Sequence, residues 1–140
     1  MKRPVVTLKS IRALKPCQKQ YRLLRKAFPD GVPLTVASAK RLARLDVSFV
    51  WYGVRALCGE QYQEFSEASH AADLTYMLET GQMYREYRNA AAIGTDRDCY
   101  AAWRKYDLAT APFRERQRFA EAKALLALLL KEHKRNGAKP

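Results

Sequence analysis

Apolar residues in the first part of the chain recur every three or four positions, which is the spacing of one face of an α-helix. The clearest stripe consists of Leu14, Cys17, Tyr21, Leu24 and Phe28. It predicts an amphipathic helix from about Pro16, whose missing N–H costs nothing in a first turn, to about Phe28. Pro29 and Gly31 should end this helix, and the turn that follows them should set the angle to the next one.

Three further short helices are predicted around this one, each from a residue whose side chain can cap a helix start. The expected N-caps are Thr7, Thr35 and then Asp46 or Ser48, and the expected ends are Ala13, Leu45 and Gly59. Together with the first helix, they predict a compact cluster of three to four short helices in residues 1–58.

From Glu60 onward the chain changes to long segments with few helix breakers. Aromatic and small residues there keep a spacing near 3.5: Tyr62, Phe65, Ser69, Ala72, Tyr76, Met83, Tyr87 and Ala90. This pattern predicts one helix of roughly thirty residues, interrupted at most near Gly81. Gly94 is expected to end it in the left-handed conformation, and Thr95 with Asp98 resembles the capping box of a new helix.

The last helix should carry four aromatic residues and the apolar run 124–130, with a kink or a new start at Pro112. No segment shows the alternation of a β-strand or a hairpin turn. The fold class is therefore predicted as all-α, in a single domain over residues 1–140. A basic short-helix module (1–58) is followed by two long helices packed as an antiparallel hairpin (60–134) and a flexible tail (135–140).

Charge divides the chain into unequal parts. The formal net charge is +12, and residues 1–60 hold thirteen Lys and Arg against three acidic residues. Between Gly59 and Met83 there is no Lys or Arg, whereas five acidic residues fall there. A cationic N-terminal part and an acidic middle favour a polyanionic partner, either a phosphate backbone or an acidic protein surface.

The best candidates for binding are cations at helical spacing on two neighbouring helices. They are Lys15, Lys19, Arg22 and Lys26, followed by Lys40, Arg41 and Arg44. A surface built only for solubility normally mixes both signs, but residues 1–28 hold nine Lys and Arg and no acidic residue. We therefore predict that these cations contact a partner or its phosphates.

The residue pattern offers no recognisable catalytic, cofactor or metal site. The two histidines, His70 and His133, lack further ligands at suitable spacing, and no phosphate-binding glycine motif is present. The three cysteines are far apart and form no C-x-x-C pair, so we expect them to be reduced and mostly buried. No catalytic residue, metal or cofactor is predicted.

Two features allow more than one interpretation. Residues 39–57 have the length of a helix-turn-helix, but the second helix offers bases mainly Arg55 and would expose Phe49 and Trp51, which favours a core helix. Seven aromatic residues could stack nucleic-acid bases, but their helical spacing favours a seam between the last two helices. They are Tyr62, Tyr76, Tyr84, Tyr87, Tyr100, Trp103 and Tyr106.

The N-terminal module resembles that of small uncharacterised helical proteins of phages and prophages. The resemblance rests on Cys17, Phe28 at a helix end, the Pro29–Pro33 turn, the Thr35 cap and Trp51. The segments "YREYRNAAA" and "YAAWRKYDLATAPFRE" are similar to the Tyr/Ala-rich helical tails that follow such modules. The resemblance implies a mobile-element origin, and proteins of this kind often act by stoichiometric binding, as anti-CRISPR proteins do.

The expected function is that of a non-enzymatic binding protein that inhibits or modulates a host nucleic-acid-handling or defence complex by occupying a surface. Its expected partner is a host protein or ribonucleoprotein with an acidic surface. The alternative is direct binding of DNA or RNA through phosphates. The start of the chain lacks a signal-peptide pattern and no eighteen apolar residues run together, so we expect a cytoplasmic protein without membrane contact. The long helices could pair within one chain or across a dimer.

Overall fold

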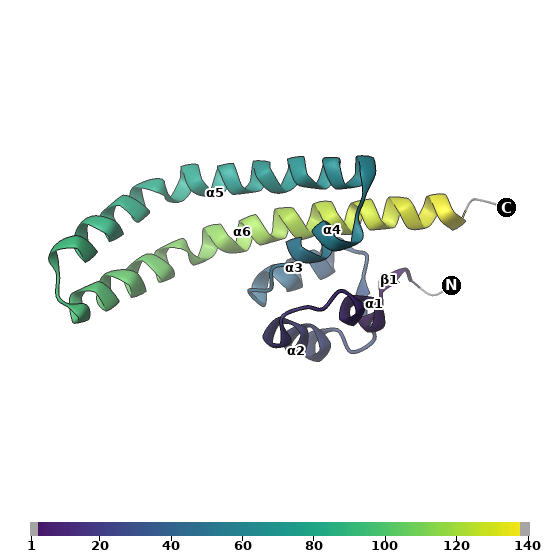
Figure 1. Cartoon of the computed structure of the whole chain (residues 1–140), viewed down its shortest axis with the longest axis horizontal. Helices are drawn as coiled ribbons and strands as arrows, with labels where there is room; N and C mark the ends of the chain where they lie inside the picture. The colour runs from purple at the N-terminus through teal and green to yellow at the C-terminus, as the bar shows by residue number, and fades with distance from the viewer. Residues whose placement is uncertain (1–2, 138–140) are drawn as a thin grey trace.

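The computed structural model describes residues 3–137 and shows an all-α protein with a small two-stranded ribbon (Figure 1). The elements in chain order are β1 (Val5–Val6), α1 (Leu8–Ala13), α2 (Gln18–Ala27), β2 (Val32–Pro33), α3 (Val36–Arg44), α4 (Val50–Ala56), α5 (Gly59–Ile93) and α6 (Asp96–Gly137). The long helices α5 and α6 form an antiparallel hairpin, and the short elements gather beside the second half of α6. The predicted fold class is confirmed. None of the helices in the described residues is both long enough and apolar enough to cross a membrane.

Two predicted caps organise the N-terminal module. The backbone N–H of Ser10 donates to Thr7 Oγ1 at 3.1 Å, and that of Ser38 donates to Thr35 Oγ1 at 3.2 Å. Each bond satisfies a backbone donor that the first turn of a helix leaves without an internal partner. The predicted starts of α1 and α3 are therefore confirmed, and Leu24 on the apolar stripe of α2 is fully buried.

The expectation that the chain has no strands is wrong at one place. Val5 and Val6 pair antiparallel with Pro33 and Val32. A ladder of two residues is too short to produce a readable alternation of apolar and polar positions. The pairing ties the turn after α2 to the chain terminus, and Gly31 makes it possible with a φ of +94° and no side chain. A Cβ atom on Gly31 would lie 2.7 Å from the carbonyl oxygen of Val6.

The link from α3 to α4 differs from the prediction. Neither Asp46 nor Ser48 caps α4, which begins after Phe49 without a side-chain cap. Asp46 instead takes a φ of +58° just beyond the end of α3. The N–H groups of Asp46 and Val47 reach back to the carbonyls of Ala43 (3.2 Å) and Leu42 (3.3 Å). This is the hydrogen-bond pattern of a Schellman motif, and the apolar Val47 that completes it is buried.

Glycine near the long helices also plays other roles than expected. Gly59 does not stop α4, which ends at Ala56, but is the first residue of α5. Helix α5 runs through Gly81 without interruption. Gly94 has an extended backbone (φ −102°, ψ 169°) rather than the left-handed one, and it leaves room for Asp98, whose Cβ a Gly94 Cβ would approach to 2.6 Å.

The predicted start of the last helix is confirmed. Thr95 N–H donates to Asp98 Oδ2 at 3.1 Å, and Asp98 N–H donates to Thr95 Oγ1 at 3.3 Å, which together form a capping box. Pro112 lies inside α6, which continues as one helix with a gentle curve. The proline deprives the carbonyl of Leu108 of its helical donor. Because both residues are exposed, this carbonyl lies on the solvent side of the helix.

The hydrophobic core lies where the module meets the hairpin. Leu42 of α3, Phe65 of α5 and Leu125 of α6 are among its most deeply buried side chains. The half of the hairpin around Gly94 extends beyond the module, and Figure 1 shows it projecting as an arm formed by two helices alone.

Replacing Gly31 with alanine should destabilise the fold, because the new Cβ would meet the Val6 carbonyl in a backbone conformation that disfavours side chains. We expect the free energy of unfolding to fall by about 1–3 kcal/mol, measured by urea denaturation. Gly81→Ala is the matched control, since no atom lies within 4 Å of its added Cβ. This control should gain up to about 1 kcal/mol, and equal losses in both variants would contradict the role of the ribbon.

Candidate anion-binding surface

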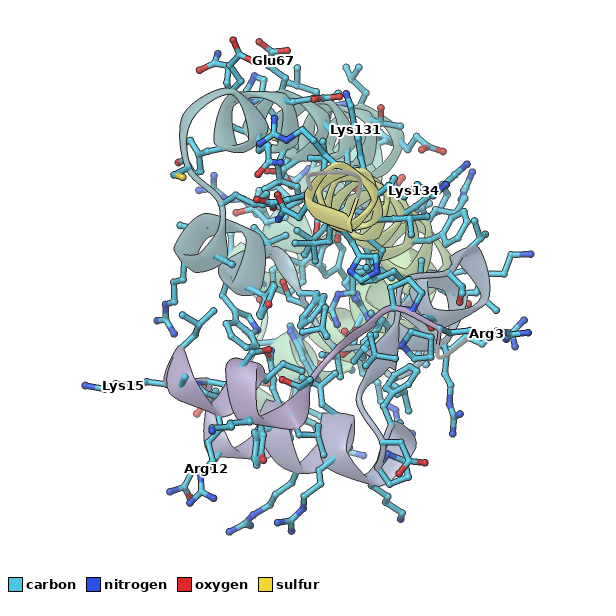
Figure 2. All side chains as sticks on the ribbon, turned by 90° about the vertical axis from the view of Figure 1, so that its right-hand side faces the viewer. Arg3, Arg12, Lys15, Glu67, Lys131 and Lys134 are labelled. Atoms are coloured by element: carbon cyan, nitrogen blue, oxygen red, sulfur yellow. The ribbon has the colours of Figure 1, made fainter. Side chains whose placement is uncertain are left out.

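A groove of about 440 Å³ runs between the end of α1 and the exposed face of α2. Its polar lining consists of Arg12, Lys15, Gln18, Tyr21, Arg22 and Arg25. Four of these six side chains are cationic, and all four residues are exposed. Figure 2 shows Arg12 and Lys15 extending outward from the module, on the opposite side of the molecule from Glu67 of α5. The groove therefore gathers positive charge at the surface, away from the acidic part of the hairpin.

The backbone that carries Lys15 is held by its neighbours. Lys15 has a φ of +53° and its N–H donates to the Arg12 carbonyl at 3.1 Å, which closes the end of α1. Arg55 of α4 then donates from Nη1 to the carbonyls of Leu14 (2.6 Å) and Lys15 (3.0 Å). Both carbonyls lie just beyond Ala13, the last residue of α1, so the Arg55 guanidinium fixes the chain where it leaves this helix.

Helix α2 is fixed to α4 by a second polar contact. The indole Nε1 of Trp51 donates to Gln20 Oε1 at 3.1 Å, and the Arg55 guanidinium lies 5.8 Å from the centre of the Trp51 ring. Both walls of the groove, α1 and α2, are thus joined to α4. The arrangement of its cations follows from the fold as well as from helical spacing.

The structure brings together only part of the predicted set. Lys15 and Arg22 line the groove, whereas Lys19 and Lys26 are exposed on α2 but do not line it. Arg12 and Arg25 were missed. Arg25 follows Arg22 by three positions, so the spacing rule could have found it. Arg12 joins the group only because α1 folds back on α2, which the sequence alone does not show.

The predicted cations of α3 have other surroundings. Arg41 lies 5.2 Å from the centre of the Phe28 ring, and Arg44 Nε lies 3.9 Å from Glu115 Oε1 of α6. This pair is largely exposed and should contribute less than about 1 kcal/mol. Lys40 is exposed. None of the three lines the groove, so the turn between α2 and α3 does not merge the two helices' cations around it.

Within the described residues, none of the cations of residues 3–28 forms an ion pair with a carboxylate; the four ion pairs involve Arg44, Arg114, Arg116 and Arg118. The cations around the groove are therefore not held by a carboxylate of the described residues. Guanidinium and ammonium groups in this state bind phosphate or carboxylate oxygens and release the solvent ions around them.

The prediction that the cysteines are mostly buried is wrong. Cys17 and Cys58 are exposed and Cys99 is half-buried, and all three are free thiols. Cys17 and Cys58 each precede the first residue of a helix, where the chain turns at the surface. The backbone N–H groups of Gln20 and Lys19 lower the pKa of the Cys17 thiol.

The structure decides one of the two interpretations that the sequence leaves open, and part of the other. Phe49 and Tyr52 are buried and stack on one another, and Arg55 is engaged in closing α1, so the core-helix interpretation of 39–57 is confirmed. Tyr87 and Tyr106 stack between α5 and α6 with ring centres 5.3 Å apart. The Tyr84 ring lies 6.0 Å from that of Tyr106, so these three residues form part of the expected seam. Tyr62, Tyr100 and Trp103 are exposed, and a seam role for them stays a prediction.

A second polar cluster lies where α4, α5 and α6 meet, around a cavity of about 270 Å³. The amide of Gln117 donates to the carboxylate of Asp73 and lies 3.4 Å from Glu121 Oε1. Arg118 Nη1 lies 2.5 Å from Asp46 Oδ1, although its N–H is not aligned as a hydrogen bond. Burial raises the pKa of the Glu121 carboxyl from 4.5 to about 7, and the charge of Asp73 adds to the rise.

No metal site accompanies these clusters in the part of the chain that the structure describes, since no three His, Cys, Asp or Glu side chains gather closely enough to hold an ion. Comparisons with models of protein families, with curated proteins and with solved structures find no match to this chain. The resemblance to phage and prophage proteins therefore stays a prediction. What the chain binds has to be inferred from its own side chains, above all those of the groove.

The Glu121 carboxyl should make stability depend on pH. Its pKa is higher in the folded protein than in the unfolded chain, so its stabilising contribution is complete below about pH 4.5 and is lost as pH rises through 7. We expect the free energy of unfolding to fall by about 2–3 kcal/mol from this group between pH 5 and 8.

Glu121→Gln should remove this loss while keeping a polar side chain beside Gln117. Denaturant unfolding of both proteins across the pH range measures the difference, and Glu64→Gln, at an exposed position on α5, is the control. Parallel pH profiles for the wild type and Glu121→Gln would contradict the assignment.

Proposed function

We propose that this chain is a non-enzymatic binding protein whose groove between α1 and α2 holds the phosphate groups of a nucleic acid. The observation that carries the proposal is the convergence of four cations on one concave surface, namely Arg12, Lys15, Arg22 and Arg25. None of them forms an ion pair with a carboxylate of the described residues. A planar guanidinium matches two phosphate oxygens at once, and three of the four cations are arginines.

Other features of the groove suit a backbone ligand better than base recognition. Gln18 adds a neutral amide, and the half-buried Tyr21 offers an aromatic edge against which a sugar or base can pack. Helix α2 presents its charged side across the opening, and phosphate contacts of this kind position a nucleic acid without reading its sequence. We therefore expect binding with little sequence preference and strong dependence on salt.

Binding of this kind suits a protein that acts by occupancy. If this protein of 140 residues covers phosphates that a host complex needs, the fraction of the complex that is inhibited would rise with the number of protein molecules bound. This role agrees with the resemblance to phage and prophage proteins that act by stoichiometric binding.

An acidic surface of a host protein or ribonucleoprotein is the second candidate partner. The observation that favours it is the set of large apolar side chains exposed on the outer face of α5, namely Leu74, Met77 and Leu78. Exposed apolar patches of this kind are typical of protein contacts rather than of phosphate contacts. In this case, the groove cations would orient the partner and speed its association.

Fluorescence anisotropy with short single-stranded and duplex DNA of one sequence, over a series of salt concentrations, tests the first candidate. The variant Arg22→Glu/Arg25→Glu should bind at least about ten-fold more weakly and lower the salt slope by roughly 2. The control Arg97→Glu/Arg104→Glu removes the same charge from exposed positions on the arm and should stay within a few-fold of wild type.

Equal weakening by both variants would show that net charge alone drives binding and would contradict the groove. If the wild type fails to bind either DNA at low salt, the nucleic-acid proposal is wrong. The same two variants, used in capture from host lysate, would then test whether the groove orients a protein partner.

A further inference from the structure

One face of the hairpin carries two consecutive shallow cavities between α5 and α6, of about 460 and 280 Å³. Alanine dominates their lining, with Ala68, Ala71, Ala72 and Ala90 from α5 and Ala101, Ala102, Ala109 and Ala120 from α6. Small side chains leave space for another helix to approach closely. A row of small residues does not itself identify an occupant, so the charges on the two walls have to be considered.

The two cavities form one groove because most of their lining residues follow one stripe on each helix. On α5 the stripe consists of Ala68, Ala72, Thr75, Glu79, Met83, Glu86 and Ala90. On α6 it consists of Ala102, Lys105, Ala109, Phe113, Arg116 and Ala120. Steps of three and four keep a residue set on one side of a helix. We call this surface the hairpin groove.

The hairpin groove faces away from the N-terminal module. Arg118 and Ala122 of α6 point toward the module, where Arg118 meets Asp46 and Ala122 joins the core. Arg116 and Ala120 each lie two positions before these residues, which places them about 200° around a helix that turns about 100° per residue. The module therefore covers one side of α6 and leaves the groove side to solvent.

Charge is divided between the two walls. The charged lining residues of α5 are Glu79 and Glu86, both acidic, and those of α6 are Lys105 and Arg116, both basic. Glu79 and Arg116 lie at the same height along the hairpin, since Arg116 Nη1 is 3.2 Å from Glu79 Oε2. Next to Glu86 and Lys105, the rings of Tyr87 and Tyr106 stack across the hairpin. At these two places the α5 wall is acidic and the α6 wall is basic.

We propose that the occupant of the hairpin groove is a second copy of this chain, related by a two-fold axis parallel to the long helices. Such an axis places α5 of one copy against α6 of the other at the same height. Glu86 of each copy then faces Lys105 of the other copy. All neighbouring helices in the resulting four-helix bundle are antiparallel. A two-fold axis across the helices would instead place acidic wall on acidic wall, so the charges favour the first arrangement.

Sedimentation velocity of the full chain at several concentrations tests this proposal through two charge reversals. Glu86→Lys and Lys105→Glu should each weaken the dimer at least about ten-fold, because each creates two like-charge contacts across the two-fold axis. An equimolar mixture of the two variants should restore the dimer, because in the mixed pair every reversed residue again faces its opposite.

Rescue by mixing is the decisive result, because a fault within one chain cannot be repaired by another chain. Circular dichroism of each variant checks that the helices are kept, and Arg104→Glu, an exposed reversal outside the groove lining, is the control that should not change the dimer. A wild type that stays monomeric at every concentration would overturn the proposal. Failure of the mixture to associate, with both single variants folded, would also overturn it.

Discussion

The apolar end of α6 packs against α3 and against the start of α5, and this contact joins the N-terminal module to the hairpin. Leu125 and Leu126 of α6, Leu42 of α3 and Phe65 of α5 are almost completely buried. Burying one such side chain stabilises a fold by about 1.5–3 kcal/mol, so a few residues account for much of the attachment. The hairpin groove depends on this contact, because it decides which side of α6 is covered and which is left free.

Residues that act through their immediate neighbours could be predicted from the sequence. The caps at Thr7, Thr35 and Thr95 act over three positions, and the stripe through Leu24 repeats within one helix, so both appear as short patterns. The ribbon between Val6 and Val32 could not be predicted, since its two strands are short and far apart in the chain. The residue type of Asp46 predicts a helix start, but its N–H bonds to the Ala43 carbonyl and it helps to end α3 instead.

The candidate binding surface shows the same limit. Lys15 and Arg22 were found because they follow helical spacing, while Arg12 reaches the groove through the fold of α1 on α2. Arg44 also follows helical spacing, but its Nε lies 3.9 Å from Glu115 Oε1, and this residue comes about seventy positions later in the chain. Charge can be counted along a sequence, but whether a charge is free depends on contacts between distant segments.

The two ends of the molecule differ in the partners that suit them. The groove between α1 and α2 presents three arginines and a lysine that form no ion pair within residues 3–137, whereas the hairpin groove has acidic residues on one wall and basic residues on the other. A surface that carries only positive charge favours a polyanion. A surface with acidic residues on one wall and basic residues at the same height on the other favours a second copy of itself. A dimer formed through the hairpin groove would carry two cationic modules, and two linked sites bind a long polyanion more tightly than one.

The central claim is that the groove between α1 and α2 is the surface that meets phosphates. The most direct test is an NMR titration of the isotopically labelled chain with a short DNA duplex, following each backbone amide. The account predicts that the largest shifts fall on α1 and α2, around Arg12, Lys15, Arg22 and Arg25, and that α5 changes little. Shifts centred on the hairpin arm, or spread evenly over all exposed cations, would contradict it.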